Sequence, residues 1–166
     1  NKRNAAKAGT TAPKAGTTEA SKFVLTAEGK VESDNFKANR GKLPWPVVDG
    51  YISLRHGDQP HPIHANVTVH NSGVEISTKP GSSARAVFGG EVLQVQVISA
   101  NNKAVYIQHG DFITVYLNLT SVNVSKGQKV SKGQSIGTLG RDINREANLY
   151  FETRKGVNPV NPMNYL

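Results

Sequence analysis

Histidines are the side chains in this sequence with the clearest capacity to bind a metal ion. The five are His56, His61, His64, His70 and His109. His61 and His64 have a three-residue spacing that occurs in loop zinc ligands, and a register slip could bring His70 toward Glu75. Residues 56–64, however, form a loop rich in Pro and Gly, with Asp58 as the nearest acid. We therefore expect surface or turn histidines here and no metal site.

Asn and Tyr side chains form a second constellation. Asn148 and Tyr150 are two apart in a strand-like segment, so both are expected to project from the same face into one groove. Tyr offers a large, fairly rigid contact with a hydrogen-bonding tip, and Asn both donates and accepts. These properties favour recognition of a peptide or a helix.

The elements that must position these residues are mostly strands. From Val47 onward, short runs rich in Val, Ile and Tyr alternate with Gly, Asn, Asp and Ser. No long helical spacer separates them, which favours antiparallel hairpins in a mainly β domain. The predicted strands are Val67–Val69, Gly73–Ser77, Ala84–Val87, Gly90–Ile98, Ala104–His109, Ile113–Leu117 and Asn148–Thr153.

Three local signals complete the expected fold. Ser33–Gly41 reads as a short helix that begins at a Ser or Asp cap and stops at Gly41. Leu43-Pro-Trp-Pro-Val47 is held extended by its prolines, with Trp45 expected in the core. The tetrapeptide Ser-Lys-Gly-Gln occurs twice within residues 124–137, and each Lys-Gly suits a turn with Gly at positive φ, which predicts a small hairpin lobe.

Composition divides the chain into three parts. Residues 1–22 are rich in Ala, Gly, Thr and Lys and are expected to be a flexible linker, residues 23–40 a short helical or extended lead-in, and residues 41–166 the folded domain. The linker carries a net charge of +4 out of the total of +8. The remaining charge lacks the clustered aromatic and basic residues of a nucleic-acid platform, so no nucleic-acid partner is expected.

Compartment signals are absent from this segment. No run reaches the roughly eighteen apolar residues of a membrane span, and no cysteine is present for disulfides or thiolate chemistry. The chain begins with Asn, so we expect a piece of a longer protein whose targeting signal lies upstream.

The order of motifs from residue 41 to residue 166 resembles the lysostaphin/LytM metallopeptidases and, within them, the EnvC-like murein hydrolase activators. The matching pieces, in family order, are Gly41–Val47, Asn71–Ile76, Val105–Gly110, Thr114–Leu119, the paired turns, Asn148–Glu152 and Asn158-Pro. The resemblance implies a LytM-like antiparallel β-sheet domain with a small β-hairpin lobe and a short N-terminal helix.

The positions of the family's zinc and catalytic residues carry other side chains. The family's His-x-x-x-Asp corresponds to Asn71–Glu75, its His-x-His to Asn148–Tyr150, and its hairpin histidine to Asn118. A neutral Asn carbonyl is a poor zinc donor, and Tyr must first lose a proton of pKa about 10. Asn cannot act as a general acid or base. The resemblance therefore implies a domain without zinc, cofactor or catalysis.

Two interpretations of these substitutions stay open: neutral drift after loss of the metal, and a groove that binds a partner. We favour the groove, with nearby arginines as candidates for pairing with acidic groups of a partner. Its predicted residues are Asn71, Glu75, Tyr116, Asn118, Asn148, Tyr150, Arg55, Arg141, Arg145 and Arg154.

By resemblance, the expected function is non-catalytic activation of a zinc-dependent N-acetylmuramoyl-L-alanine amidase during daughter-cell separation, in the periplasm of a Gram-negative bacterium. Peptidoglycan is a further possible partner. The alternatives are a peptidoglycan-binding module without an amidase partner and, as the weaker one, an active zinc endopeptidase with rearranged ligands.

Overall fold

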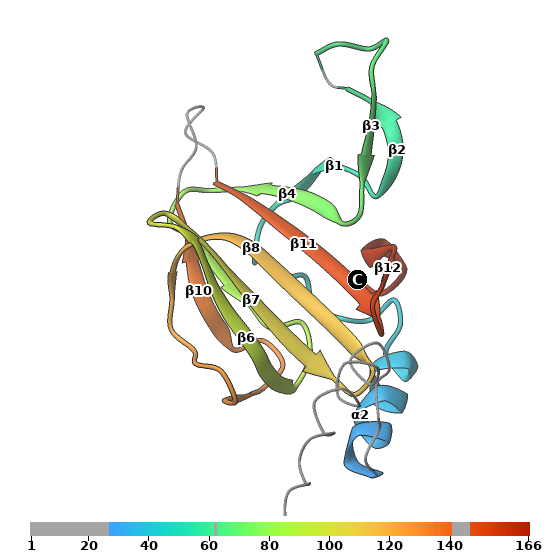
Figure 1. Cartoon of the computed structure of the whole chain (residues 1–166), viewed down its shortest axis with the longest axis vertical. Helices are drawn as coiled ribbons and strands as arrows, with labels where there is room; N and C mark the ends of the chain where they lie inside the picture. The colour runs from blue at the N-terminus through green and yellow to red at the C-terminus, as the bar shows by residue number, and fades with distance from the viewer. Residues whose placement is uncertain (1–26, 62, 141–146) are drawn as a thin grey trace, which may run out of the picture.

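The computed structural model describes residues 27–61, 63–140 and 147–166, so the predicted linker over residues 1–22 lies outside it. The described chain forms a ten-stranded sheet and a separate two-stranded sheet, both antiparallel (Figure 1). The mainly β fold predicted from the sequence is confirmed. No helix among the described residues is long and apolar enough to cross a membrane.

The large sheet follows the order β1-β4-β11-β8-β7-β6-β9, with β10 joining β8 to β5 and β12 paired to β11. The small sheet is the β2-β3 hairpin, which extends from the top of the molecule in Figure 1. The strands are β1 (Tyr51–Leu54), β2 (Gly57–Pro60), β3 (Thr68–Asn71), β4 (Val74–Thr78), β5 (Ser83–Arg85), β6 (Gly90–Ser99), β7 (Asn102–His109), β8 (Phe112–Val122), β9 (Lys129–Val130), β10 (Ser135–Leu139), β11 (Ala147–Lys155) and β12 (Asn158–Val160); the helices are α2 (Ala27–Ala38) and the 3-10 turn η2 (Pro162–Asn164).

The predicted helix starts earlier than the sequence indicated. Helix α2 begins at Ala27, so Ser33 is not its N-cap. Ser33 is buried instead, and its hydroxyl donates a hydrogen bond to the Asp111 carboxylate. Gly41 has a φ of 81°, and its N–H donates to the Tyr165 carbonyl at 2.9 Å, which turns the chain toward the sheet. Phe36 brings α2 into the core by stacking on Phe112 at 4.6 Å.

Trp45 lies against the core, as predicted. The extended segment around it is tied to β5, because Arg85 donates from Nε to the Trp45 carbonyl and from its backbone N–H to the Pro46 carbonyl, each at 2.8 Å. These two bonds hold the extended segment against β5.

The two Ser-Lys-Gly-Gln repeats form equivalent turns. Gly127 and Gly133 have φ values of 86° and 82°, which confirms the predicted positive φ. In each turn the Gln side chain accepts from the Ser backbone N–H, at 3.0 and 2.9 Å. The first turn bonds to both backbone groups of Val92, and the second to both of Ala86. The repeat therefore anchors the small lobe to the sheet at two points.

Strands β1 and β2 were not predicted. Strand β2 has the sequence Gly-Asp-Gln-Pro, whose residues rarely form strands. It is extended because it pairs with β3 over residues 57–60 and 68–71, where His70 also bonds to Asp58 at 2.6 Å. The loop predicted around His56–His64 is therefore partly a hairpin.

A hydrogen-bonded chain crosses the core beneath α2. His109 is fully buried, and its Nδ1 donates to the Gly89 carbonyl at 2.7 Å. In the neutral ring Nε2 then accepts from the Thr114 hydroxyl, 2.9 Å away. That hydroxyl lies 3.0 Å from the Tyr116 hydroxyl, which accepts from the Val87 N–H at 3.1 Å. Burial lowers the pKa of His109 to about 4, against the opposing effect of the Gly89 carbonyl.

This burial predicts acid sensitivity. Between pH 6.5 and 4 the unfolded chain protonates His109 while the folded chain does not, so the stability from the neutral ring is full above pH 6.5 and falls toward pH 4. The loss is about 3 kcal/mol at most. Urea unfolding from pH 7.5 to 4 should show a shallower fall for His109→Gln than for the unchanged chain. Parallel curves would contradict the assignment.

Candidate functional site

The candidate site lies on the sheet face that points away from the core. Tyr150 of β11 is directly opposite Glu75 of β4, and Asn148 is opposite Ser77. Directly opposed residues share a face, so these four side chains form one surface. Leu149 and the other odd-numbered residues of β11 from 147 to 153 are buried on the opposite face. The predicted common orientation of Asn148 and Tyr150 is confirmed.

Asn118 joins this surface from β8. Its side-chain Nδ2 donates to the Asn148 carbonyl at 3.1 Å, and its backbone N–H donates to Asn102 Oδ1 at 3.1 Å. The Asn148 side chain in turn accepts from the Ser77 hydroxyl at 2.8 Å. Asn118 has a φ of 74°, the one positive φ among the described non-glycine residues, which Asn tolerates better than most side chains. A connected row of amides and hydroxyls thus runs from β8 to β4.

Asn71 and Glu75 form hydrogen bonds with residues in strand β1 or directly after it. Asn71 donates from Nδ2 to the Arg55 carbonyl at 3.1 Å, and Ser53 donates its hydroxyl to Glu75 Oε1 at 2.8 Å. Between them, Gly73 passes so close to β11 that an added Cβ would lie 2.3 Å from the Phe151 carbonyl oxygen. Only glycine fits there, and this close approach holds the Asn71–Glu75 segment beside Tyr150.

Tyr150 begins a second polar row along β11. Its hydroxyl donates to Glu152 Oε1 at 3.0 Å, and Arg154 Nε donates to Glu152 Oε2 at 2.5 Å. Glu152 is only 5% exposed, so its charge is compensated mainly by Arg154. Arg154 also lies 6.0 Å from the centre of the Tyr106 ring. Burial, followed by the Glu152 charge, raises the pKa of Tyr150 to about 12.

The prediction that Tyr116 lines the groove is wrong. Leu117, not Tyr116, is opposite Tyr150, so Tyr116 points to the core, where it is fully buried and packs 5.3 Å from Phe151. The one-residue difference follows from the two-residue period of a strand. Leu117 therefore takes its place on the groove face.

The two predicted arginines that the structure describes lie in different places. Arg154 lies in the β11 row described above. Arg55 lines a polar pocket of about 390 Å³ between β2 and η2, together with His56, Asp58, Gln59, Asn161 and Met163. Arg141 and Arg145 fall outside the described residues.

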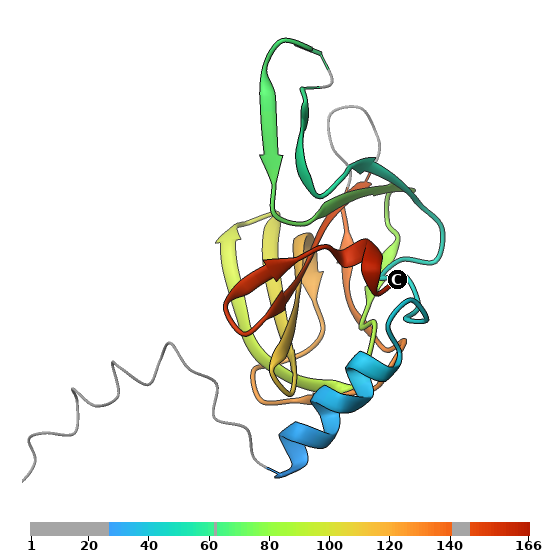
Figure 2. The ribbon, with the colours of Figure 1, turned by 90° about the vertical axis from the view of Figure 1, so that its right-hand side faces the viewer.

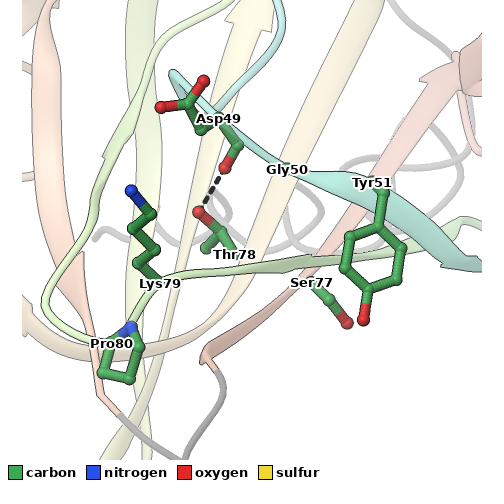
Figure 3. A pocket seen from close by; sticks show the side chains of 7 residues that line it. All are labelled: Asp49, Gly50, Tyr51, Ser77, Thr78, Lys79 and Pro80. Carbon is green, nitrogen blue, oxygen red and sulfur yellow. Dashed lines mark hydrogen bonds between the residues drawn. The ribbon is translucent and has the colours of Figure 1, made fainter.

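A second pocket, of about 460 Å³, adjoins the row of amides and was not predicted. Ser77 belongs to both the pocket and the row, and Tyr51 lies directly opposite it on β1 with 57% of its surface exposed. Figure 3 shows Lys79 and Asp49 beside the Thr78 hydroxyl, which donates to the Asp49 carbonyl. The complete lining is Asp49, Gly50, Tyr51, Ser77, Thr78, Lys79 and Pro80. Next to this pocket, the apolar residue Val48 is exposed, as is Tyr51 in its lining.

The residues at the expected zinc positions do not fit a catalytic zinc ion. The hydroxyl of Tyr150 donates to Glu152 and has a raised pKa, whereas a ligand would need to be the phenolate. The amide of Asn71 is engaged by the Arg55 carbonyl, which leaves Glu75 as the charged donor at these positions.

His56, His61 and His70 each form a local hydrogen bond through Nδ1. His61 Nδ1 accepts from the backbone N–H groups of Ile63 and His64, both at 3.1 Å, so the neutral ring carries its proton on Nε2 in this arrangement. His70 bonds to Asp58, and His56 Nδ1 lies 2.9 Å from the Ser72 carbonyl. Over the described ranges, no three His, Cys, Asp or Glu residues converge.

Several known proteins are similar to this chain in sequence. The murein hydrolase activator NlpD of Salmonella typhimurium is 28% identical over 145 residues, covering 86% of this chain and 36% of NlpD. The peptidoglycan DD-endopeptidase ShyA of Vibrio cholerae is 34% identical over 105 residues, covering 62% of this chain and 24% of ShyA. This chain thus spans well under half of either relative.

Structure and family comparisons agree. The crystal structure of Helicobacter pylori Csd3 superposes with a TM-score of 0.63 and 29% identity, covering 75% of this chain and 34% of Csd3. The family described as Peptidase family M23 matches residues 69–162, more than half of the chain, from β3 to the start of η2. The chain therefore belongs to peptidase family M23, as a degenerate LytM-type domain.

Proposed function

We propose that this chain is a non-catalytic activator of a zinc-dependent N-acetylmuramoyl-L-alanine amidase and that the polar groove on β4, β8 and β11 contacts the amidase. The observation that supports the proposal is the row Asn118, Asn148 and Ser77. Asn118 and Asn148 stand at family active-site positions, and Asn118 donates to the Asn148 carbonyl while the Asn148 side chain accepts from Ser77. NlpD, a relative over most of this chain, is named a murein hydrolase activator, which supports a role in peptidoglycan hydrolysis and a cell-envelope location.

The groove has the chemistry of a recognition surface. Its amides and hydroxyls donate and accept hydrogen bonds, while Leu117 and the ring of Tyr51 add apolar contact area. The pocket beside Ser77 can accept a side chain from the partner. The described lead-in leaves this face open, because Phe36 of α2 packs on Phe112 and His109, on the core side of the sheet.

Activation requires a difference in affinity. A bound activator shifts the amidase toward its open state only if it binds that state more tightly than the closed state. A tenfold shift corresponds to about 1.4 kcal/mol of differential binding, which two or three groove contacts can supply.

The first prediction concerns activity on sacculi. Dye-labelled sacculi should release little dye with this chain alone, a basal amount with a periplasmic amidase alone, and clearly more with both. Release by this chain alone would favour the endopeptidase alternative, and no gain from the pair would remove the activator proposal. Sedimentation of this chain with sacculi without amidase, at low and high salt, tests the peptidoglycan-binding alternative.

A second prediction tests the groove itself. Asn148→Ala and Tyr150→Ala should each raise the half-maximal activating concentration about tenfold, because they remove contacts at the centre of the surface. Asn118 should be changed to Gly, since Ala would be strained at a φ of 74°. Asn101→Ala, at an exposed turn residue, is the matched control and should activate normally. Normal activation by all three groove variants would place the amidase elsewhere.

A third prediction concerns zinc. After chelation and reloading, the unchanged chain should retain far less than one equivalent of zinc by metal analysis, because Glu75 is the one charged donor at the family's zinc positions. The combined changes Asn71→His, Glu75→Asp, Asn148→His and Tyr150→His restore the family pattern and should bind about one equivalent. Stoichiometric zinc in the unchanged chain would support the endopeptidase alternative, to which the name of ShyA lends weight.

A further inference from the structure

Strand β6 has a free edge. On one side it pairs with β7 along its length, but on the other side β9 pairs only with Gly90 and Glu91. Val92 completes this contact through hydrogen bonds with Gly127 and Gln128 at 2.7 and 2.8 Å. Within the described part of the chain, no strand pairs with the outer edge of residues 93–99. Figure 2 shows this strand along one side of the molecule.

Apart from two β-bulges, this edge lacks the features that usually prevent pairing. Natural edge strands carry lysine, proline or inward-pointing charges, whereas Val92–Asn102 contains no proline and no charged side chain. Leu93 is 40% exposed and Val97 is 66% exposed. The two β-bulges of β6 lie between Val92 and Gln94 and between Val97 and Ser99, so residues 94–97 between them are regular. The edge is therefore an open template for another strand.

The geometry points to a second copy of this chain as the occupant, with the two β6 edges paired antiparallel about a two-fold axis. The unpaired part of the edge begins at residue 93, after the turn before β9, and ends at residue 99, before the turn between β6 and β7. A symmetric pair that fills this unpaired part is centred on Gln96. Gln96 then lies opposite Gln96 of the other copy, and Val95 lies opposite Val97, which buries the most exposed large hydrophobic side chain of the edge.

The lack of charged side chains favours this edge as the contact between two copies of the chain. The chain carries a net charge of +8, so two copies repel each other across most approaches. Along the uncharged stretch, backbone groups can pair without like charges coming into contact. One strand pair buries less than the roughly 1,200 Å² of a stable standard interface, so the dimer should be weak and should depend on concentration.

Single cysteines test the register, because the chain has no cysteine of its own. In the symmetric pair the two residues at position 96 face each other within disulfide range, whereas those at position 94 are about 14 Å apart along the strands. Gln96→Cys in the full chain should form a disulfide-linked dimer in an oxidised-glutathione buffer. Gln94→Cys, also an exposed glutamine on the same strand, is the matched control and should crosslink at least tenfold more slowly. Equal crosslinking would overturn the register.

Sedimentation velocity tests the pairing without any crosslink. The unchanged chain should move from monomer to dimer between micromolar and millimolar concentrations. Val97→Lys should stay monomeric, because it places two cations against the paired edges. Ile63→Lys makes the same change at an exposed residue of the β2-β3 hairpin and should dimerise normally. A chain that is monomeric at millimolar concentration, or a Val97→Lys variant that still dimerises, would overturn the proposal.

Discussion

The register of β11 between β4 and β8 is the constraint on which the rest of the structure depends. A shift of one residue would turn Asn148 and Tyr150 into the core and expose Leu149 and Phe151. The buried Leu149 and Phe151 side chains oppose such a shift through their apolar burial. Gly73 adds a steric lock, because it passes against the Phe151 carbonyl where no side chain fits. One register therefore sets both the core and the groove.

The same register explains how the domain can keep its frame without a metal. A buried polar group costs about 1–3 kcal/mol when its partner is missing. Here the polar groups that stand at family active-site positions bond to one another or to the backbone, as Asn118 does to Asn148 and Asn71 to Arg55. Glu152, the most buried acid of this face, is bonded by Tyr150 and Arg154. These polar groups thus find their partners within the chain.

The sequence predicted features with a local cause. The two Lys-Gly turns and the alternation around Asn148–Tyr150 follow from short-range rules, and both are present. Tyr116 was misplaced because residues 115–117 are apolar or aromatic throughout, so alternation cannot tell the two faces apart. Strands β1 and β2 and the start of α2 depend on distant partners, such as Asp111 for Ser33, which one sequence does not reveal.

The two proposed surfaces are geometrically coupled through the sheet. An antiparallel pair of identical strands has its two-fold axis normal to the sheet, so both copies keep the same face on the same side. Tyr106, which packs near Arg154 of the groove row, donates its hydroxyl to Gln96 at the centre of the β6 edge. A dimer would therefore present two grooves toward one side, joined by a continuous sheet. Such an arrangement raises the effective concentration of the second groove for a partner held on a flat polymer.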